Sequence, residues 1–212
     1  MELRDRESIP VLGGFLGCIA LLAALLLAFF SQITAKPITE ARERTRQAVF
    51  HRLSLPEFDS AGKAVLKNEV LFYPVLKEKK ICGYVGQGSS SGYGGKITVL
   101  AGFDVAGKIT GVQILEHKET PGLGANVCDR KFQRTIFNLG EKAPEIPPNN
   151  YLDQFAGVNA ADSGSWKISK DGGKFDYITG ATVTSRAVTD AVDRIAAAFK
   201  SLQDANKGEH LK

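Results

Sequence analysis

The feature that most constrains this chain is an apolar run near its N-terminus. The 20 residues from Val11 to Phe30, VLGGFLGCIALLAALLLAFF, contain no charged side chain. A helix of about 20 residues rises about 30 Å, which matches the hydrocarbon thickness of a bilayer. A cleaved secretory signal has an apolar region of only about 7–15 residues and a small-residue exit, whereas this run leads into SQITAKP. The sequence therefore predicts a tail at residues 1–10 and a retained transmembrane helix at residues 11–30.

The charges that flank this run leave its orientation open. Two arginines precede it, and four basic residues follow it closely: Lys36, Arg42, Arg44 and Arg46. A count of flanking positive charges would place the large domain in the cytoplasm. The same rule weakens for long translocated segments, so charge alone does not fix the orientation.

The rest of the chain has the composition of one ordinary globular domain. The 212 residues are 43% apolar and 24% charged. Residues 1–30 contain two of the 27 basic and three of the 23 acidic side chains, which leaves 25 basic and 20 acidic residues. This excess of positive charge is small, and no dense cluster of lysine and arginine is interleaved with aromatic residues. Nucleic acid is therefore not an expected partner.

The three cysteines do not indicate a metal site. Cys18 lies in the apolar run, and Cys82 and Cys128 are far apart, with no Cys-x-x-Cys spacing. We expect Cys82 and Cys128 to be small, buried free thiols. A disulfide bridge between them is the alternative if the domain lies outside the cytoplasm.

The segment 31–65 has the features of a helical stalk. Pro37 is expected to break the apolar helix, and Thr39 can cap a second helix from Glu40 to about Leu53. The arginines of this second helix most simply form a solvated face: Arg42, Arg44, Arg46 and Arg52.

The middle of the chain has the pattern of β-hairpins. Four segments are rich in Val, Ile, Thr and aromatic residues: 69–76, 81–87, 96–104 and 108–117. Short turns join them in pairs, and Pro74 suggests that the first strand lies at an edge. Loops rich in glycine, proline and asparagine follow at residues 118–128 and 143–150. Consecutive hairpins predict an antiparallel sheet packed with helices in an α+β domain, at residues 66–205, with a tail at 206–212.

The C-terminal segment is the clearest helix. Its apolar residues recur at steps of three and four: Val188, Ala191, Val192, Ile195, Ala198, Phe199 and Leu202. One face of this helix should therefore pack on the sheet. The stretch DYITGATVTSRAV, residues 176–188, places several hydroxyl residues around a glycine at the helix entrance. A turn and an N-cap explain them, but free backbone N–H groups and the helix dipole also favour a phosphate there.

A glycine-rich stretch, GSSSGYGGK at residues 88–96, resembles two known motifs at first sight. It fails the Walker A pattern because Ser90 and Ile97 stand where that motif needs a glycine and a hydroxyl residue. It satisfies Gly-x-Ser-x-Gly around Ser90, but a strand follows where a nucleophile elbow needs a helix. A hydrolase built on Ser90 and His117 stays an alternative. The other reading is a flexible strand connection in which Tyr93 could lie near a flat ligand.

A second loop, EHKETPGLG at residues 116–124, leaves the end of a strand. Pro121, Gly122 and Gly124 predict a tight turn in which the backbone can approach a ligand closely. Three polar residues beside the turn are candidates for ligand contact: His117, Glu119 and Thr120. A plain surface turn with a hydrogen-bonded histidine would explain the same residues.

The stretch at the helix entrance also carries a resemblance. Residues 176–182, Asp-Tyr-Ile-Thr-Gly-Ala-Thr, match the flavinylation motif Asp-x-x-(Ser/Thr)-Gly-Ala-Thr position for position. HKETPGLG and SGYGGKI resemble two further signatures of the same family, in the same order. Over its whole length the chain resembles the FMN-binding domain proteins found as the G-subunit of the Rnf electron-transport complex and as the C-subunit of the sodium-translocating NADH:quinone reductase. Its short length resembles the Rnf protein more closely.

The resemblance implies a covalent cofactor. In that family the last threonine of the motif, here Thr182, carries FMN through a phosphoester, which a separate flavin transferase forms from FAD with a divalent metal. A threonine hydroxyl is a poor nucleophile, so an external base and metal are physically reasonable. Thr179 and Gly180 would let the chain bend toward the transferase, with Ala181 completing the motif. Asp176 would engage the transferase's metal or a nearby backbone group.

The resemblance also implies which residues surround the flavin ring. The wall around the isoalloxazine is assigned to the second loop, beside His117, with Leu123 packing on the ring: Glu119, Thr120, Pro121, Gly122, Leu123 and Gly124. Tyr93, Gly94, Gly95 and Lys96 are expected nearby, and Lys96 could offset the charge of the phosphate or of the reduced flavin. No catalytic residue and no metal ligand is expected in this chain.

By the same resemblance, the chain is expected to be an electron-carrier subunit of an ion-translocating ferredoxin:NAD oxidoreductase complex. It would be a single-pass protein of the inner membrane with its domain on the periplasmic side. Its expected partners are the other membrane subunits and the flavin transferase. No Gly-x-Gly-x-x-Gly fingerprint follows a strand, so an NAD pocket is not expected. The alternatives left open are the quinone-reductase subunit, the hydrolase and a noncatalytic membrane-tethered binding module.

Overall fold

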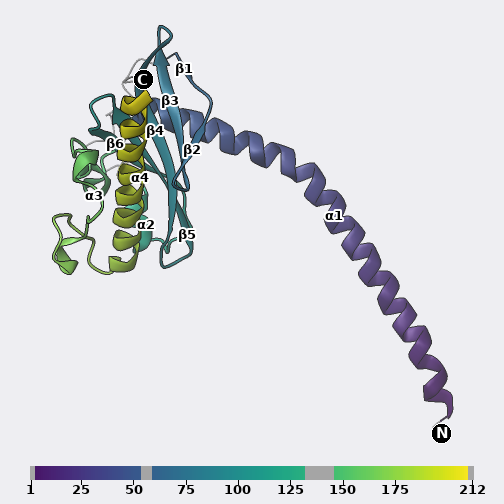
Figure 1. Cartoon of the computed structure of the whole chain (residues 1–212). Helices are drawn as coiled ribbons and strands as arrows, with labels where there is room; N and C mark the ends of the chain where they lie inside the picture. Colours follow the sequence, from purple (N-terminus) through teal and green to yellow (C-terminus); the bar gives the residue numbers. More distant parts are fainter. Residues whose placement is uncertain (1–2, 54–58, 132–145, 210–212) are drawn as a thin grey trace, which may run out of the picture. The chain divides into compact units, whose positions relative to one another are not determined.

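The computed structural model of the chain describes residues 3–53, 59–131 and 146–209. The chain divides into two compact units, Met1–Thr45 and Arg46–Lys212. The first unit consists of the N-terminal part of helix α1 (Leu3–Leu53), and the second contains the sheet and the shorter helices (Figure 1).

Helix α1 contains the apolar run. Its segment Leu12–Thr34 is long and apolar enough to cross a membrane, and the side chains of this segment are exposed. The expected break at Pro37 is wrong, because α1 continues to Leu53 and Thr39 therefore caps no new helix. A proline inside a helix removes one backbone hydrogen bond and strains the preceding turn, but good helix-forming neighbours can carry the helix past it. The arginine face lies outside the described side chains and stays a prediction.

The second unit contains an antiparallel sheet of six strands. Four strands form a meander in which each pairs with the next: β3 (Val70–Lys77), β4 (Lys80–Ser91), β5 (Lys96–Asp104) and β6 (Ile109–Glu116). Two short strands, β1 (Ser60–Ala61) and β2 (Val65–Lys67), pair with the other side of β3. The predicted α+β class with an antiparallel sheet is confirmed.

Strand β3 is not an edge strand, contrary to the expectation from Pro74. Strand β2 pairs with the first residues of β3 and β1 pairs with its last residues, so Pro74 lies between two short ladders. Its carbonyl accepts a hydrogen bond from the Gly62 N–H at 2.7 Å. Because proline has no N–H to donate, the outer ladder is interrupted at this position, and two short strands stand where one long strand would otherwise pair.

Strand β4 is longer than expected, because its serines pair with β5 up to Ser91 opposite Lys96. The glycine-rich stretch is therefore not a flexible connection but the end of a hairpin, closed by Gly92 N–H donating to the Gly95 carbonyl at 2.8 Å. Gly95 has a φ of +129°, which favours glycine. Ser90 pairs with Ile97 inside the ladder. It does not stand on a strand-to-helix turn, so the nucleophile elbow is absent at this serine.

The segment after β6 adds helices beside the sheet (Figure 1). Within residues 117–131 and 146–209, four are short: α2 (Gly124–Cys128), α3 (Asn150–Asp153), η2 (Ala160–Asp162) and η3 (Ser169–Asp171). The long helix α4 runs over Thr182–Glu209 and packs on β4 and β5. Its predicted apolar face is confirmed, since six of the seven apolar positions are buried and Leu202 is partly buried against them.

The contact between α4 and the sheet is close and largely aromatic. The ring of Phe199 stacks on Phe103 with centroids 4.4 Å apart, and the rings of Tyr84 and Phe72 lie at 5.4 and 5.9 Å. Two glycines of β4 let the helix approach. A Cβ at Gly86 or Gly88 would lie 2.5 or 2.8 Å from a side-chain carbon of Ile195, well inside van der Waals contact.

The opposite face of the sheet is covered by the last residues of α1. Val49, Phe50 and Leu53 are buried against Tyr73 and against a set of aliphatic residues of the sheet: Val75, Val85 and Leu100. The hydroxyl of Thr110 on β6 donates to the carbonyl of Leu53. The end of α1 is thus part of the folded domain.

The cysteines Cys82 and Cys128 are free thiols, as expected, but only Cys128 is buried, because Cys82 is half-buried. Cys128 belongs to the apolar cluster under α4, whereas Cys82 packs with the cluster under the end of α1 and donates to the Val75 carbonyl at 3.3 Å. The two clusters lie on different faces of the sheet, so a bridge between the two thiols is not formed.

Replacing Phe199 with alanine tests the α4 contact. The loss of a fully buried ring should lower the free energy of unfolding by about 3–5 kcal/mol. Urea denaturation of the detergent-solubilised chain, followed by far-ultraviolet circular dichroism, measures this change. Leu66→Ala on the exposed face of β2 is the matched control and should change the free energy by less than about 0.5 kcal/mol. Equal effects of the two variants would contradict the assignment of Phe199 to the core.

Candidate functional site

Three loops that are far apart in the sequence meet around one pocket. They are the hairpin loop (residues 91–96), the proline loop (residues 117–124) and the helix entrance (residues 176–184). The pocket has a volume of about 550 Å³. Eleven residues line it: Tyr93, Glu119, Thr120, Leu123, Gly124, Lys170, Gly180, Ala181, Thr182, Val183 and Thr184. All three stretches singled out from the sequence therefore contribute to the same site.

The side chain of Glu119 connects the three loops. It is buried, with 6% of its surface exposed. One carboxylate oxygen, Oε1, accepts from the Gly94 N–H of the hairpin loop at 3.0 Å. The other, Oε2, accepts from the Thr184 hydroxyl of α4 at 2.7 Å. A Cβ at Gly92 or Gly124 would overlap one of these oxygens, so both glycines make room for the carboxylate.

The helix entrance places two hydroxyl residues in the pocket lining, Thr182 and Thr184, and the Thr184 hydroxyl is already bonded to Glu119. Thr182 is the first residue of α4, is half-buried and lines the pocket. Among the described residues, no side-chain hydrogen bond holds its hydroxyl. Gly180 has a φ of +82°, and the Ala181 N–H donates to the Ile178 carbonyl at 2.9 Å, which closes the turn before the helix. Thr179 is exposed in this turn and does not line the pocket.

His117 supports the proline loop from outside the pocket lining. Its Nδ1 accepts from the Glu119 N–H at 3.2 Å, so the other ring nitrogen, Nε2, carries the proton and donates to Asp129 at 2.8 Å. Lys131 pairs with the same carboxylate at 2.7 Å. Partial burial acts to raise the pKa of Asp129, but the hydrogen bonds from Lys131 and His117 and the positive charge of Lys131 outweigh it and hold that pKa below its usual value. Both ring nitrogens of His117 are engaged away from Ser90, so the structure does not bring a hydrolase dyad together.

Several other expected residues lie beside the pocket rather than in its lining. Pro121 and Gly122 are exposed at the tip of the proline loop, where Asn126 donates to the Gly122 carbonyl at 2.8 Å. Gly95 is exposed in the hairpin loop. Lys96 lines a separate hollow of about 590 Å³ between the serines of β4 and the charged side chains Asp190, Asp193 and Arg194.

Asp176 faces a third hollow, of about 670 Å³, formed with α2 and α3. Its backbone N–H donates to Gln154 Oε1 at 2.7 Å, which fixes the chain where it enters the motif. The carboxylate of Asp176 is exposed and is free to face an approaching protein.

The predicted site residues did not include Lys170, Val183 or Thr184, although Val183 and Thr184 lie in the stretch 176–188 that the sequence singled out. Lys170 lies on η3, and its ammonium stands 5.7 Å from the centre of the Tyr177 ring. The bidentate pair of Asp171 and Arg186, at 2.6 and 2.7 Å, holds η3 against α4. A three-residue helix has no periodic pattern, so no sequence signal could find Lys170. Val183 and Thr184 follow the motif in the first turn of α4 and could have been included on that ground.

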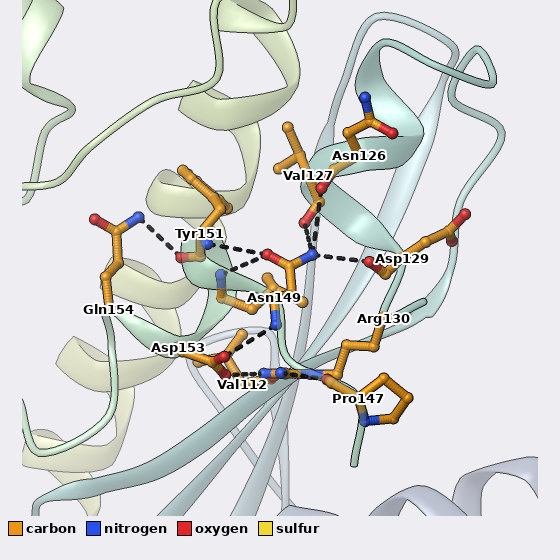
Figure 2. Close-up of polar contacts among 11 residues, drawn as sticks. Val112, Asn126, Val127, Asp129, Arg130, Pro147, Asn149, Tyr151, Asp153 and Gln154 are labelled. Carbon is orange, nitrogen blue, oxygen red and sulfur yellow. Dashed lines mark hydrogen bonds and ion pairs between the residues drawn. The ribbon is translucent and has the colours of Figure 1, made fainter. Parts of the chain in front are cut away.

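A further group, which sequence reasoning also missed, holds α2 behind the pocket (Figure 2). The amide nitrogen of Asn149 donates to the carbonyls of Asn126, Val127 and Asp129 at 3.3, 3.3 and 2.9 Å. Its Oδ1 accepts from the N–H groups of Tyr151 and Leu152, which caps α3. The side-chain amide of Asn149 thereby provides hydrogen-bond partners for backbone carbonyls at the end of α2 and for backbone N–H groups at the beginning of α3.

Arg130 completes this group. It donates to the Pro147 and Val112 carbonyls at 3.1 and 3.2 Å and pairs with Asp153 at 2.7 Å (Figure 2). The arginine therefore ties the segment after α2 both to β6 and to α3.

Replacing Asn149 with alanine tests this support. Three backbone carbonyls and two N–H groups would lose their partner in a buried position, so we expect the free energy of unfolding to fall by about 1–3 kcal/mol. Asn150→Ala, at the exposed neighbouring position, is the control and should stay within about 0.5 kcal/mol of the wild type. Urea denaturation curves of the two variants give the comparison, and equal midpoints would contradict the assigned role.

Comparison with known proteins agrees with the geometry. Residues 92–197 match the family model of the FMN-binding domain. The chain is 31% identical to the G-subunit of the ion-translocating oxidoreductase complex of Stutzerimonas stutzeri over 202 residues, which cover 90% of this chain and 80% of that protein. It is 32% identical to the protein of the same name in Cereibacter sphaeroides over 203 residues, covering 90% and 84%. The protein of that name in Escherichia coli strain K12 is 35% identical over 182 residues, covering 80% of each chain.

Solved structures also match the chain, among them that of NqrC. The crystal structure of NqrC from Shewanella oneidensis aligns with a TM-score of 0.44 at 20% identity, over 74% of this chain and 72% of that one, and this likeness is too weak to carry an argument. The family model and the sequence relatives suffice: the chain belongs to the FMN-binding domain family, in the group formed by the G-subunits of ion-translocating oxidoreductase complexes.

Proposed function

We propose that this chain is a membrane-anchored electron-transfer subunit of an ion-translocating oxidoreductase complex and that it holds FMN in the pocket between its three loops. One observation carries the proposal. The residues that match the FMN-binding domain, 92–197, include every residue that lines the pocket. The complex is inferred from the relatives, which are named as its G-subunit. Those names favour this complex over the quinone reductase.

The pocket suits the chemistry of FMN. Its volume of about 550 Å³ lies within the range of about 300–1,000 Å³ that is usual for cofactor sites. Leu123, Val183 and Tyr93 supply apolar and aromatic surface for a flat ring. Lys170 and the N-terminal turn of α4 supply positive charge for a phosphate. Lys170 lines the pocket and Lys96 does not, so Lys170 is the better placed of the two to offset the phosphate charge.

Among the hydroxyls of the helix entrance, Thr182 is the one placed for covalent attachment. Thr184 is 1% exposed and donates to Glu119, and Ser185 is fully buried and accepts from the Ile178 N–H at 3.2 Å. Thr179 is exposed but lies outside the pocket lining. Only Thr182 combines partial exposure with a place in that lining.

The attachment is a transfer of the FMN half of FAD. The Thr182 oxygen forms a bond to the FMN phosphorus, the pyrophosphate bond of FAD breaks, AMP leaves, and the hydroxyl proton passes to a base of the transferase. The transferase is needed because the pocket places no strong base on the Thr182 hydroxyl. The exposed Asp176 carboxylate, six residues before Thr182, is available for contact with that enzyme.

The rim of the pocket fits a carrier rather than a substrate-converting enzyme. Tyr93, Leu123 and Val183 are 77%, 51% and 47% exposed, so a ring packed on them keeps an accessible edge. Bound FMN supplies the redox chemistry. This chain's residues hold and orient it, and leave its edge open to a neighbouring subunit of the complex. We place the domain on the periplasmic side, because the flavinylation motif points to that side although the flanking charges point to the cytoplasm.

Replacing Thr182 with valine tests the covalent link. The wild-type chain, coexpressed with a flavin transferase, should gain the mass of FMN less one water, and its band in a denaturing gel should fluoresce under ultraviolet light. Thr182→Val keeps the shape of the side chain but has no hydroxyl, so both signals should disappear. Ser90→Ala, which removes a hydroxyl outside the motif and outside the pocket lining, is the control and should keep both. Intact-mass spectrometry reads the outcome, and an adduct that persists in Thr182→Val would contradict the assigned residue.

Substituted-cysteine labelling tests the orientation. Lys63 is exposed in the loop between β1 and β2. A Lys63→Cys variant in a Cys82→Ser background should react with a membrane-impermeant maleimide in intact spheroplasts if the domain is periplasmic. The Cys82→Ser chain alone should stay unlabelled, because Cys128 is buried and Cys18 lies in the candidate membrane span. Labelling only after lysis would place the domain in the cytoplasm.

A further inference from the structure

The carboxylate of Glu119 is a buried acid at the junction of the three loops. It lines the pocket with 6% of its surface exposed. Among the described residues, no lysine or arginine pairs with it. Its two hydrogen-bond partners are neutral groups, the Gly94 N–H and the Thr184 hydroxyl. Burying a carboxylate without a countercharge is costly, and a neutral side chain of the same shape could accept from the same donors.

Residues from three separate loops nevertheless make room for this carboxylate or bind it. Gly92 and Gly124 come from two different loops, and a Cβ at either would overlap a carboxylate oxygen. The hydrogen bond to Thr184 spans 65 positions in the sequence and the one to Gly94 spans 25. Folding of the sheet and packing of α4 therefore bring the Gly94 N–H and the Thr184 hydroxyl to the Glu119 carboxylate.

We propose that Glu119 is the positioning residue of the flavin site, which holds the hairpin loop and α4 at a fixed spacing around the ring and lowers the reduction potential of the bound flavin through its negative charge. This proposal rests on the proposed function, since it needs FMN in this pocket. The spacing follows from the two hydrogen bonds, which fix the loops on both sides of the pocket. The effect on potential follows from Coulomb's law, because reduction adds electrons to the flavin beside a fixed negative charge in a partly dry site.

The variant Glu119→Gln separates charge from shape. A glutamine can accept from the Gly94 N–H through its oxygen and donate through its nitrogen to the Thr184 oxygen, which also accepts. The loops should keep their spacing, the flavin should attach, and the midpoint potential should rise. If the substitution favours the reduced flavin over the oxidised flavin by a factor of ten, the midpoint potential rises by about 30 mV for a two-electron couple. Redox titration of the flavinylated, detergent-solubilised chain measures it.

The control for the change of charge is Glu78→Gln. Glu78 lies in the turn between β3 and β4, at the end of β4 opposite to the hairpin loop. The Glu78→Gln substitution removes one carboxylate from the same domain without touching the pocket, so the midpoint potential of the flavin should stay at the wild-type value.

The variant Glu119→Ala tests the spacing without any flavin. Both donors would lose their acceptor in a buried position, so amide hydrogen exchange at residues 92–95 and 118–124 of the unflavinylated chain should become about tenfold faster. Exchange within β3 should not change. Glu119→Gln should keep the slow exchange of the wild type, because the glutamine amide can bond to both the Gly94 N–H and the Thr184 hydroxyl.

The outcomes decide between the alternatives. Slow exchange in Glu119→Ala would overturn the positioning role. An unchanged potential in Glu119→Gln would overturn the role of the charge. Failure of Glu119→Gln to take up flavin while its loops exchange slowly would also overturn the proposal, because the loop spacing alone should suffice for loading. If the wild-type chain itself carries no flavin, the proposed function fails, and the exchange data still judge the role of Glu119 in the loops.

Discussion

The packing of α4 on the sheet is the contact on which the rest of the domain depends. Phe199 lies among the aromatic rings of three strands, and the glycines of β4 remove the side chains that would hold the helix away. Because α4 begins at Thr182, the contact that buries its apolar face also fixes the position of the helix entrance. The hairpin loop is fixed by the same sheet. The pocket therefore lies between two well-packed elements, although most of its lining comes from loops.

A covalent tether and a shallow pocket are physically consistent with each other. Free FMN would have to offset about 4–15 kcal/mol of lost translational and rotational freedom on binding. A cofactor joined to Thr182, as we propose, would already have lost that freedom, so the protein would not need to enclose the ring to retain it. Leu123 and Val183 can then remain half-exposed. An exposed edge shortens the distance to a redox partner, which a deep pocket would lengthen.

Local patterns in the sequence predicted the four long strands, the apolar face of α4 and the three stretches that form the pocket. The features that these patterns missed are very short elements or contacts between residues that are far apart in the sequence. Strands β1 and β2 have two and three residues and show no alternation. Pro37 is a strong local helix breaker, yet α1 continues through it. The bonds of Glu119 to Gly94 and Thr184, and those of Asn149 to the carbonyls at the end of α2, join residues 20 or more positions apart, which no periodicity reports.

The position of Cys128 has a consequence for the chemistry beside the pocket. Burial raises the pKa of its thiol to about 12, and the negative charges of Glu119 and Asp129 act in the same direction. Thiolate is the form that attacks electrophiles and is oxidised to sulfenic acid. The Cys128 thiol therefore stays protonated at neutral pH and is a poor target for electrophiles and oxidants.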